Sequence, residues 1–559
     1  MNATPPPGAS TTAAPTDAPD APEAPDLPAD RVGAAPDAVR PRVERPATIT
    51  DAFLRSLVAR VPSSGAPPWQ LTEVYTGERL VDLPQSSPAD IEEAFARARE
   101  AQRTWAGWSV RKRLRVFRKA HQLLLDNALT TADLIQAESG KNRRMALEET
   151  CDPPMVISHY LKRAPRLLSP TRRGGPVPLV SSSTEIRRPK GVVGIIAPWN
   201  FPFATGLSDA IPALMAGNAV VLKPDNKTAL SPLHGIALLE KAGLPRGLFQ
   251  VVCGEGPDVG PTLIDHADYV MFTGSTATGR VIGERAGRNL IGCCLELGGK
   301  NPMIVLDDVD VDEWVAGALF GVFGNTGQIC MHIERIYLPD SRYDELKAAF
   351  VKATEALQIG ATYDFGPDLG SLVSPEHMAR VYAHVEDAIA HGATVVTGGR
   401  ARPDIGPAFF EPTILEGVTS EMACGVTETF GPVVALHRYR TLEEAIALAN
   451  DTDYGLNASV WGADLGRAER VARRIDAGNV NVNDALATAY ASKGTPSGGI
   501  KQSGVGARHG DQGLLKYTDA QNLAVLKKQV MGIRPGQDYD AYVQQMLGGL
   551  KMMRRLRIR

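Results

Sequence analysis

Cys330 stands at the end of a glycine-containing segment, 324–330, directly before an apolar run at 333–338. This pattern predicts a turn that delivers one thiol to the start of a strand. The reactive form of cysteine is the thiolate, and neither sequence neighbour of Cys330 can take its proton, which leaves His332 as the nearest titratable side chain. A lone cysteine is more often a small buried hydrophobe, so this residue by itself leaves a structural and a nucleophilic interpretation open.

A second residue that could do chemistry is Glu296, a carboxylate in an apolar stretch that precedes two glycines and Lys300. Burying a carboxylate is costly and raises its pKa toward neutrality, which suits a general base. An ion pair with Lys300 would explain the same carboxylate without any chemistry. The local sequence leaves a general base and a structural ion pair equally open.

The elements that would position these residues alternate between strands and helices. Four short apolar runs predict strands at 191–196, 219–222, 248–252 and 269–272. Helical stretches between them predict a doubly wound parallel sheet, and such sheets bind ligands beyond the carboxyl ends of their strands. Here those ends carry Asn200, Lys223 and a turn that begins at Gly274.

The turn at 274–279, with the sequence GSTATG, is weak evidence alone. It follows an apolar run and opens a helical stretch, where backbone N–H groups can face a phosphate. No lysine of the kind found in nucleoside-triphosphate loops follows the turn, which disfavours an NTPase.

The composition bounds the class of protein. A chain of 559 residues is too long to fold around one ordinary hydrophobic core, so we expect two or more domains. A content of 43% apolar and 22% charged residues is typical of a globular protein. The net charge of -3 argues against a nucleic-acid binder, and no apolar run is long enough to predict a membrane span. Six cysteines without CxxC spacing predict neither a disulfide framework nor a metal site, and they fit a reducing, cytoplasmic compartment.

The two ends of the chain differ from its middle. Residues 1–47 are rich in proline and alanine, which predicts a disordered tail and no secretory signal. From 89 to 138 the spacing of apolar residues predicts packing helices, with Ser87 as the first cap. The segment 528–559 ends in five cations within its last nine residues, and we interpret it as a basic, solvated tail rather than a site for an anionic surface.

Six motifs in this chain stand in the order found in the aldehyde dehydrogenase superfamily. They are PWNFP from Pro198, KP at Lys223, FTGSTATG from Phe272, ELGGK from Glu296, GQIC ending at Cys330, and ETFGP from Glu428. The resemblance covers about residues 48–525. Longer strings such as LGGKNPMIVL and SGVGARHG are most similar to the actinobacterial succinate-semialdehyde dehydrogenases.

The resemblance implies an α/β fold with a doubly wound, Rossmann-type cofactor-binding domain and an α/β catalytic domain. The first would comprise 48–164 and 188–297, and the second 298–513. The segments 165–187 and 514–527 would form a small β oligomerisation element, which implies a homodimer or homotetramer.

The resemblance also implies catalytic roles. Cys330 would attack the aldehyde carbon as a thiolate, and the side-chain amide of Asn200 with the backbone N–H of Cys330 would hold the oxyanion. Loss of hydride from the thiohemiacetal would leave a thioester, and Glu296 would activate the water that hydrolyses it. The implied activity is NAD(P)-dependent oxidation of an aldehyde to a carboxylic acid. Release of the acyl group to CoA is an alternative, and the glutamate argues for hydrolysis.

Seven residues are implied to bind the cofactor. Lys223 would bind a ribose and also help to orient the thiol, Glu428 would hold the nicotinamide ribose, and Phe430 would lie against the ring. Gly274 and Ser275 would approach the pyrophosphate. The full set is Trp199, Lys223, Asn226, Gly274, Ser275, Glu428 and Phe430.

Two departures from the family pattern bear on specificity. Asn226 stands where many members carry a glutamate that repels a 2′-phosphate, and Lys223 and Lys227 add positive charge, so NADP is favoured over NAD. Gly324 stands where many succinate-semialdehyde enzymes carry an arginine for the distal carboxylate. Lys493 is a possible substitute, although we favour a solvated loop lysine. Succinate semialdehyde is the best substrate candidate, and a broad range of aliphatic or aromatic aldehydes is the alternative.

Overall fold

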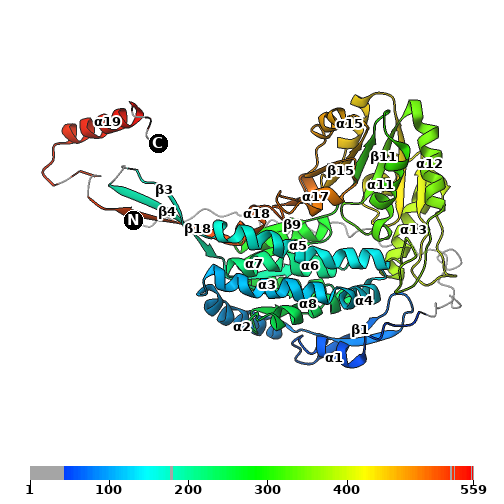
Figure 1. The fold of residues 1–559 in the computed structure, drawn as a ribbon, viewed down its shortest axis with the longest axis horizontal. Helices are drawn as coiled ribbons and strands as arrows, with labels where there is room; N and C mark the ends of the chain where they lie inside the picture. Colours follow the sequence, from blue (N-terminus) through cyan, green and yellow to red (C-terminus); the bar gives the residue numbers. More distant parts are fainter. Residues whose placement is uncertain (1–42, 177–179, 529–531, 534, 556, 558–559) are drawn as a thin grey trace, which may run out of the picture.

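The computed structural model describes residues 43–176, 180–528, 532–533, 535–555 and 557. Most of the tail predicted to be disordered lies outside the described residues, and 43–47 form neither helix nor strand. Figure 1 shows a main body from which a narrow β-arm and a C-terminal helix project.

Helices form the first layer after the N-terminal strands. The cap predicted at Ser87 is present and forms a capping box: the Ser87 hydroxyl accepts from Asp90 N at 3.3 Å, and the Asp90 carboxylate accepts from Ser87 N at 2.8 Å. The predicted helical region is confirmed. These elements are α1 (Asp51–Val58), β1 (Ala66–Thr72), β2 (Arg79–Gln85), α2 (Pro88–Ala106), α3 (Val110–Asp126), α4 (Ala128–Ser139) and α5 (Arg143–Leu167).

The predicted parallel sheet is present, with the strand order β17-β9-β8-β5-β6-β7. Its first strand in the chain, β5, lies between β8 and β6, so the winding direction reverses beside it. Only the short edge strand β17 runs antiparallel. The strands are β5 (Val192–Ile196), β6 (Ala219–Lys223), β7 (Phe249–Val251), β8 (Tyr269–Thr273), β9 (Gly292–Glu296) and β17 (Gly504–Val505).

Helices cover both faces of this sheet, as alternating strands and helices require. Ser275 caps α10 by accepting from Thr278 N at 3.2 Å, directly after the glycine turn. The connecting elements are α6 (Pro202–Ser208), α7 (Ala210–Ala216), η1 (Asn226–Thr228), α8 (Leu230–Lys241), α9 (Gly256–His266) and α10 (Thr276–Arg288).

A second sheet carries the thiol, with the strand order β12-β13-β14-β11-β10-β15-β16. Its strands run parallel except for β12 at the edge. The strand predicted after Cys330 is confirmed as β11, near the centre. The strands are β10 (Asn301–Val305), β11 (Ile333–Pro339), β12 (Thr394–Thr397), β13 (Thr413–Glu416), β14 (Val433–Tyr439), β15 (Asn457–Trp461) and β16 (Asn479–Val482).

Further helices flank the second sheet. Figure 1 shows α11, α12 and α15 around it in the upper part of the body. They are α11 (Val311–Phe323), η2 (Gly324–Gly327), η3 (Asp340–Arg342), α12 (Tyr343–Glu355), α13 (Pro375–Ala390), α14 (Ala423–Val426), α15 (Leu442–Asn450), α16 (Leu465–Ala472), α17 (Ala487–Ala491), η4 (Lys501–Ser503) and α18 (Gln512–Leu515).

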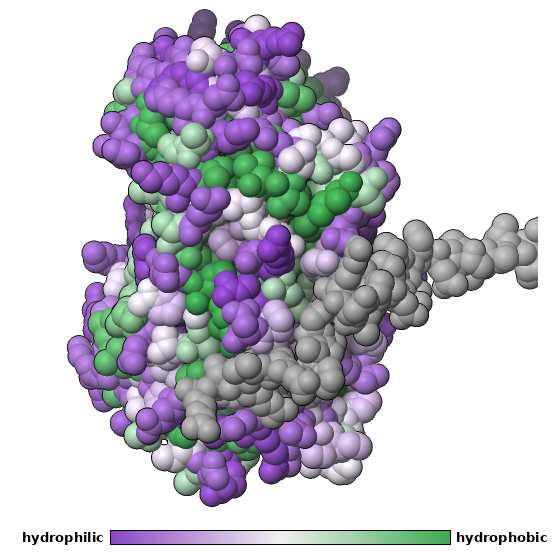
Figure 2. Space-filling model, turned by 90° about the vertical axis from the view of Figure 1, so that its right-hand side faces the viewer, coloured by the Kyte–Doolittle hydropathy of each residue, from purple (hydrophilic) through white to green (hydrophobic). Residues whose placement is uncertain are grey.

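The buried apolar residues divide between the two sheets. The cluster around the first sheet lies mostly before residue 298, with Tyr363, Phe409, Leu514 and Tyr517 added from later in the chain, and a cluster of the second sheet begins at Met303. Figure 2 views the end of the body that lies on the right in Figure 1; hydrophobic residues gather in the band between an upper and a lower lobe. The domain limits stated above remain our prediction.

The projecting arm is an antiparallel sheet with the order β18-β4-β3. It overlaps the predicted oligomerisation segments, but its limits differ from the prediction. The strands begin later, because α5 continues to Leu167 and α18 to Leu515, and β4 extends two residues past the predicted limit at 187. The strands are β3 (Thr171–Gly174), β4 (Ser181–Pro189) and β18 (Thr518–Leu526). Beyond the arm, α19 (Tyr539–Arg555) is a helix within the segment interpreted as a tail, and none of its residues is buried. Among the described residues, no helix is long and apolar enough to cross a membrane.

Candidate active site

The thiol follows a turn whose backbone is unusual. Asn325, Thr326 and Gly327 have φ angles of 50°, 56° and 72°, three successive residues in the left-handed region. A Cβ on Gly327 would lie 2.0 Å from the carbonyl oxygen of Gly431, so only glycine fits. This close approach fixes the turn, and thereby Cys330, against the loop that precedes β14.

The Asn200 side chain is tied to the same turn. Its Nδ2 donates to the carbonyl oxygen of Gln328 at 3.0 Å, and Asn325 Nδ2 donates to that oxygen at 3.0 Å as well. An amide carries two N–H groups, so Asn200 keeps a second donor. The predicted oxyanion partner is therefore held beside Cys330.

His332 does not serve the thiol. Its Nδ1 lies 2.6 Å from the carbonyl oxygen of Ile329, and its Nε2 lies 3.1 Å from Glu334 Oε1. Both ring nitrogens are thus directed at other groups. This answers the question that the sequence left open about the nearest titratable neighbour.

Glu296 ends β9 and is buried, with 5% of its surface exposed. Lys300 pairs with Glu334, so the structural explanation of Glu296 as the partner of Lys300 is wrong. The cation that does face it is Arg508, whose Nη1 lies 3.7 Å from Glu296 Oε2. Burial raises the pKa of Glu296 to about 7, against the opposing charges of Arg508 and Lys516. Such a carboxyl can exchange protons near neutral pH.

The thiol itself rests in its protonated form. Burial raises the pKa of Cys330 to about 12, and the positive charge of Arg508 opposes this rise while Glu428 and Glu296 add to it. The Lys223 ammonium instead donates to the carbonyl oxygen of Pro224 at 3.2 Å. Arg508, rather than Lys223, therefore acts on the charge of the thiol.

Two cavities meet at Cys330. One of about 710 Å³ and one of about 230 Å³ are both lined by Cys330, Asn200 and Thr273. The larger cavity extends along the carboxyl ends of β5 and β8 and also contains Glu296. The smaller one lies between α5, α6 and α17. One thiol can therefore face two ligands at the same time.

The larger cavity brings together most of the predicted cofactor-binding residues. Trp199 and Phe430 form an edge-to-face pair, with ring centroids 5.4 Å apart. Glu428 accepts from Gly299 N at 3.0 Å, and burial raises its pKa to about 8. A Cβ on Gly298 would lie 2.4 Å from Glu428 Oε2, which keeps this stretch of the wall free of side chains. The predicted residues that line the cavity are Trp199, Gly274, Ser275, Glu428 and Phe430.

These features fit a dinucleotide. The cavity starts at the N-terminus of α10, where backbone N–H groups favour phosphate, and ends at two aromatic rings and a carboxylate beside the thiol. Lys223 and Asn226 are both buried and do not line it. Asn226 donates to Gln85 Oε1 at 3.0 Å and accepts from Gly254 N at 3.1 Å, so its amide already bonds within the protein.

The smaller cavity corrects the interpretation of Lys493. This lysine is buried, and its ammonium donates to Asp152 at 2.5 Å, to the carbonyl oxygen of Tyr490 at 3.0 Å and to His509 at 3.1 Å. It is not a solvated loop residue. Its charge is balanced by Asp152, because a buried ammonium needs a partner.

The remaining wall of the smaller cavity is largely apolar. It is lined by Met145, Met155, Phe201, Phe320, Ile329, Met331, Leu486 and Tyr490, among others. Arg508, the other cation in this wall, is paired with Asp209 at 2.9 Å. Both cations of the wall thus have an aspartate partner.

Sequence reasoning missed a row of polar residues on α13. His377, Arg380 and His384 line the larger cavity at helical spacing. His377 Nε2 bonds the carbonyl oxygen of Phe430 at 2.8 Å, and burial lowers the pKa of His377 to about 4, so the ring is neutral. The helical period of these residues was visible in the sequence, but nothing there indicated that α13 faces the cavity.

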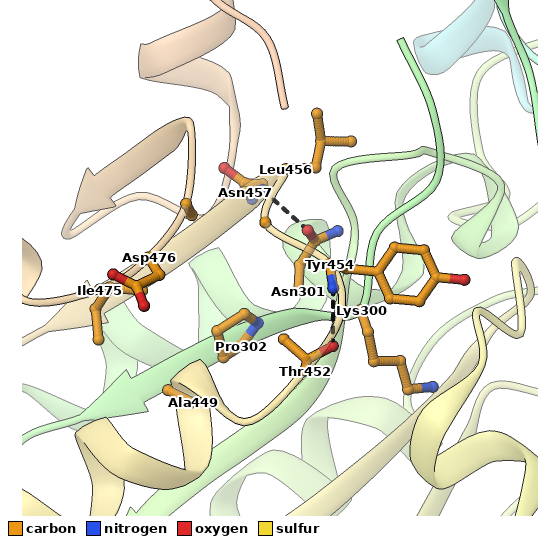
Figure 3. Close-up of a pocket in the computed structure, with 12 residues that line it drawn as sticks. Lys300, Asn301, Pro302, Ala449, Thr452, Tyr454, Leu456, Asn457, Ile475 and Asp476 are labelled. Carbon is orange, nitrogen blue, oxygen red and sulfur yellow. Dashed lines mark hydrogen bonds between the residues drawn. The ribbon is translucent and has the colours of Figure 1, made fainter. Parts of the chain in front are cut away.

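A third cavity lies behind the glycines that follow Glu296. It has a volume of about 10 Å³, room for one water at most. Figure 3 shows Lys300, Asn301 and Pro302 on one side and the segment that carries Tyr454, Leu456 and Asn457 on the other, joined where Asn457 N donates to Asn301 Oδ1 at 3.0 Å. This cavity is a packing gap between two strands and not a ligand site.

Comparison with known proteins agrees with this geometry. The model of the aldehyde dehydrogenase family matches residues 61–523. A Mycolicibacterium smegmatis protein with the provisional name succinate-semialdehyde dehydrogenase [NADP(+)] is 46% identical over 490 residues, which are 88% of this chain and 94% of the relative. The 4,4′-diapolycopene aldehyde oxidase of Methylomonas sp is 39% identical over 447 residues, 79% of this chain and 83% of that protein.

Among solved structures, the betaine aldehyde dehydrogenase of Staphylococcus aureus in complex with NAD+ superimposes with a TM-score of 0.82. It is 30% identical, and the match covers 86% of this chain and 97% of that one. The fold expected from the sequence is thereby confirmed.

The turn before Cys330 generates the first prediction. Gly327→Ala should lower kcat/KM by at least about 100-fold, because the new methyl group displaces the turn and a 1 Å shift of a reacting group can cost that much. Gly324→Ala is the matched control: its Cβ would meet nothing closer than 3.5 Å. Steady-state kinetics of both purified variants check this, and an active Gly327→Ala enzyme would contradict it.

Proposed function

This chain belongs to the aldehyde dehydrogenase family, and from this premise we propose that it oxidises succinate semialdehyde to succinate with NADP as hydride acceptor. The observation that carries the chemistry is the position of Cys330 where the two cavities meet, with Asn200 and Glu296 beside it. The substrate enters through the smaller cavity, and the dinucleotide occupies the larger one.

The residues around Cys330 divide the reaction into two stages. The thiolate adds to the aldehyde carbon, and the second N–H of Asn200 with the backbone N–H of Cys330 stabilises the oxyanion. When bound, the nicotinamide supplies the hydride acceptor. Glu296 then takes a proton from water as the water attacks the thioester, which releases the acid and restores the thiol.

Glu296 suits this second stage because its pKa of about 7 allows both forms at neutral pH. The thiol needs a proton acceptor too, since its pKa is about 12. Glu296 and Glu428 both line the larger cavity, with pKa values of about 7 and about 8. Because Glu428 already accepts from Gly299 N, we assign the thiol proton to Glu296.

Three residues would hold the nicotinamide end of the cofactor: Glu428 the ribose, and Phe430 and Trp199 the ring. Arg380 adds a cation to the same wall, next to the neutral His377, whose ring nitrogens bond the Phe430 carbonyl oxygen and Arg380. NADP is supported by the name of the M. smegmatis relative and by the absence of a carboxylate at Asn226. NAD remains the alternative, as the staphylococcal relative binds it.

Succinate semialdehyde is supported by the name of the same relative, which is 46% identical to this chain. A different observation favours a second candidate, an uncharged aliphatic or aromatic aldehyde. The smaller cavity is mainly apolar, and Lys493 and Arg508 are each paired with an aspartate. The carboxylate of the first candidate must therefore compete with Asp152 for Lys493.

Assembly and compartment complete the proposal. The arm formed by β3, β4 and β18 stands clear of the body in Figure 1 and exposes Leu523, Val525 and Leu526. This supports a homodimer or homotetramer in which the arm contacts a second copy. Six free cysteines support a reducing cytoplasm.

The two stages can be separated by variants. Cys330→Ala should abolish turnover. Glu296→Gln should form reduced cofactor more slowly, up to one equivalent, and then stall as an acyl-enzyme, with hydrolysis slowed about 10²- to 10⁴-fold. In the wild type, hydrolysis should rise as pH increases through about 7, because the base must lose its proton. Rapid-mixing absorbance and intact mass measure both effects. Normal turnover by Glu296→Gln would assign this residue a structural role.

The substrate class can be tested with two aldehydes of equal length. Succinate semialdehyde should exceed butanal in kcat/KM by about tenfold, a difference of about 1.4 kcal/mol. Asp152→Asn should increase this ratio further, because it frees the charge of Lys493. Glu148→Gln removes an acid that lines the same cavity but pairs with Arg144, and it serves as the control. Equal efficiency for both aldehydes in the wild type would support the second candidate.

We predict that a carboxylate at position 226 changes the cofactor preference, although Asn226 itself does not line the larger cavity. Asn226→Glu should lower the ratio of kcat/KM for NADP to that for NAD by about tenfold or more, since the carboxylate repels a 2′-phosphate and charge-assisted contacts contribute about 1.5–3 kcal/mol. Gln85 can turn its amide to donate to the new carboxylate. The effect should appear in KM and weaken with salt. Kinetics with each cofactor at two ionic strengths check this, and an unchanged ratio would show that position 226 does not meet the phosphate.

A further inference from the structure

Arg508 lies beside Glu296 and has no role in the two stages of the reaction described above. It follows the short strand β17, which pairs antiparallel with β9 so that Gly504 lies opposite Glu296. The Arg508 backbone exchanges two hydrogen bonds with Ser497, at 2.7 Å and 2.9 Å. The arginine is thus anchored on a rigid element next to the strand that ends in Glu296.

Its guanidinium is held from one side only. Nε donates to both carboxylate oxygens of Asp209, at 3.0 Å and 3.2 Å, and Nη2 donates to Asp209 at 2.9 Å and to the Thr273 hydroxyl. This fork fixes the plane of the group. Nη1 has no hydrogen-bond partner among the described residues and lies 3.7 Å from Glu296 Oε2.

The burial of these three side chains makes their charges effective. The exposed fractions of the side chains alone are 11% for Arg508, 5% for Asp209 and 6% for Glu296. Charges that water does not screen interact far more strongly than exposed ones. At 3.7 Å the contact with Glu296 is an attraction between charges and not a direct hydrogen bond, so it favours the carboxylate form and leaves its oxygens free for a water molecule.

We propose that Arg508, fixed by Asp209, is a positioning residue that holds Glu296 as a carboxylate directed at the acyl group on Cys330. This inference rests on the proposed role of Glu296 and extends it to a pair of residues 299 positions apart. Asp209 sets the strength of the effect, because it takes up part of the positive charge of Arg508.

The charged groups around Glu296 determine whether each substitution raises or lowers its pKa. Arg508 and Lys516 favour its charged form, and Asp209 disfavours it, whereas Cys294 Sγ lies 3.9 Å from Glu296 Oε1. Lys516 bonds the carbonyl oxygen of Ala507 at 3.1 Å and lies behind Cys294. Loss of Arg508 should therefore raise the pKa of Glu296, and loss of the charge of Asp209 should lower it.

The test measures hydrolysis without the cofactor. 4-Nitrophenyl acetate acetylates a thiolate directly: the C–S bond forms, 4-nitrophenolate leaves, and water then releases acetate. Decay of the acetyl-enzyme, followed by intact mass from pH 5.5 to 9, reports the second stage alone. The full-length chain is used for the wild type and for Arg508→Met, Arg508→Lys, Asp209→Asn and Glu296→Gln.

Opposite shifts are expected. Arg508→Met should move the midpoint of the decay profile up by about one pH unit and slow decay at pH 7 by about fivefold, whereas Asp209→Asn should move the midpoint down. Arg508→Lys keeps the positive charge, so its midpoint should stay close to that of the wild type, but its maximal decay rate should be lower. Arg163→Met is the matched control, since Arg163 forms a similar fork with Asp511 outside the site.

The outcomes separate the two proposals. If Glu296→Gln slows decay but neither Arg508→Met nor Asp209→Asn moves the midpoint, or both move it in one direction, the role of Arg508 is overturned while that of Glu296 stands. If Glu296→Gln leaves decay unchanged, the proposed base itself fails. Should Arg508→Met not fold, the downward shift in Asp209→Asn, or its absence, decides the question.

Discussion

The site depends on one buried carboxylate, Glu334, which connects three separate segments. It lies on β11, four residues after the thiol, and pairs with Lys300 from the motif that carries Glu296. It also accepts from Thr429 N at 2.9 Å and Phe430 N at 3.1 Å. Burial opposes its charge, but Lys300 and the neighbouring imidazole hold its pKa well below the ordinary value. The nucleophile, the base and the cofactor loop are thereby fixed to one another.

Three other buried ion pairs follow the same rule, and Glu296 departs from it. Lys141 pairs with Glu149, Lys493 with Asp152, and Arg508 with Asp209. Each pair is internally balanced, as burial requires. Glu296 is compensated only by the side of Arg508 that forms no hydrogen bond and by the more distant Lys516. Burial therefore raises its pKa to about 7. A carboxyl that is incompletely compensated is the one suited to exchange protons.

The sequence predicted the frame of this site better than its charges. Strands ending at Lys223 and Thr273, the turn before Cys330 and the cap at Ser87 follow from local patterns, because periodicity and turn chemistry act over a few residues. Lys493 was misinterpreted because its partner, Asp152, lies 341 positions away, on α5. Glu296 had an apparent partner four residues on, and the real one is distant. Local sequence cannot show which charges share a buried space.

The resting thiol and its neighbours also constrain how the reaction begins. The pKa of Cys330, about 12, lies well above that of Glu296, about 7, so proton transfer from the thiol to the carboxylate is unfavourable in the resting site. A neutral thiol is slow to oxidise, which protects the enzyme between turnovers. Attack on the aldehyde converts the thiolate charge into an oxyanion that Asn200 can stabilise, so bond formation offsets the cost of ionisation. The enclosure that keeps Cys330 inert alone is therefore compatible with reactivity once a carbonyl carbon lies beside it.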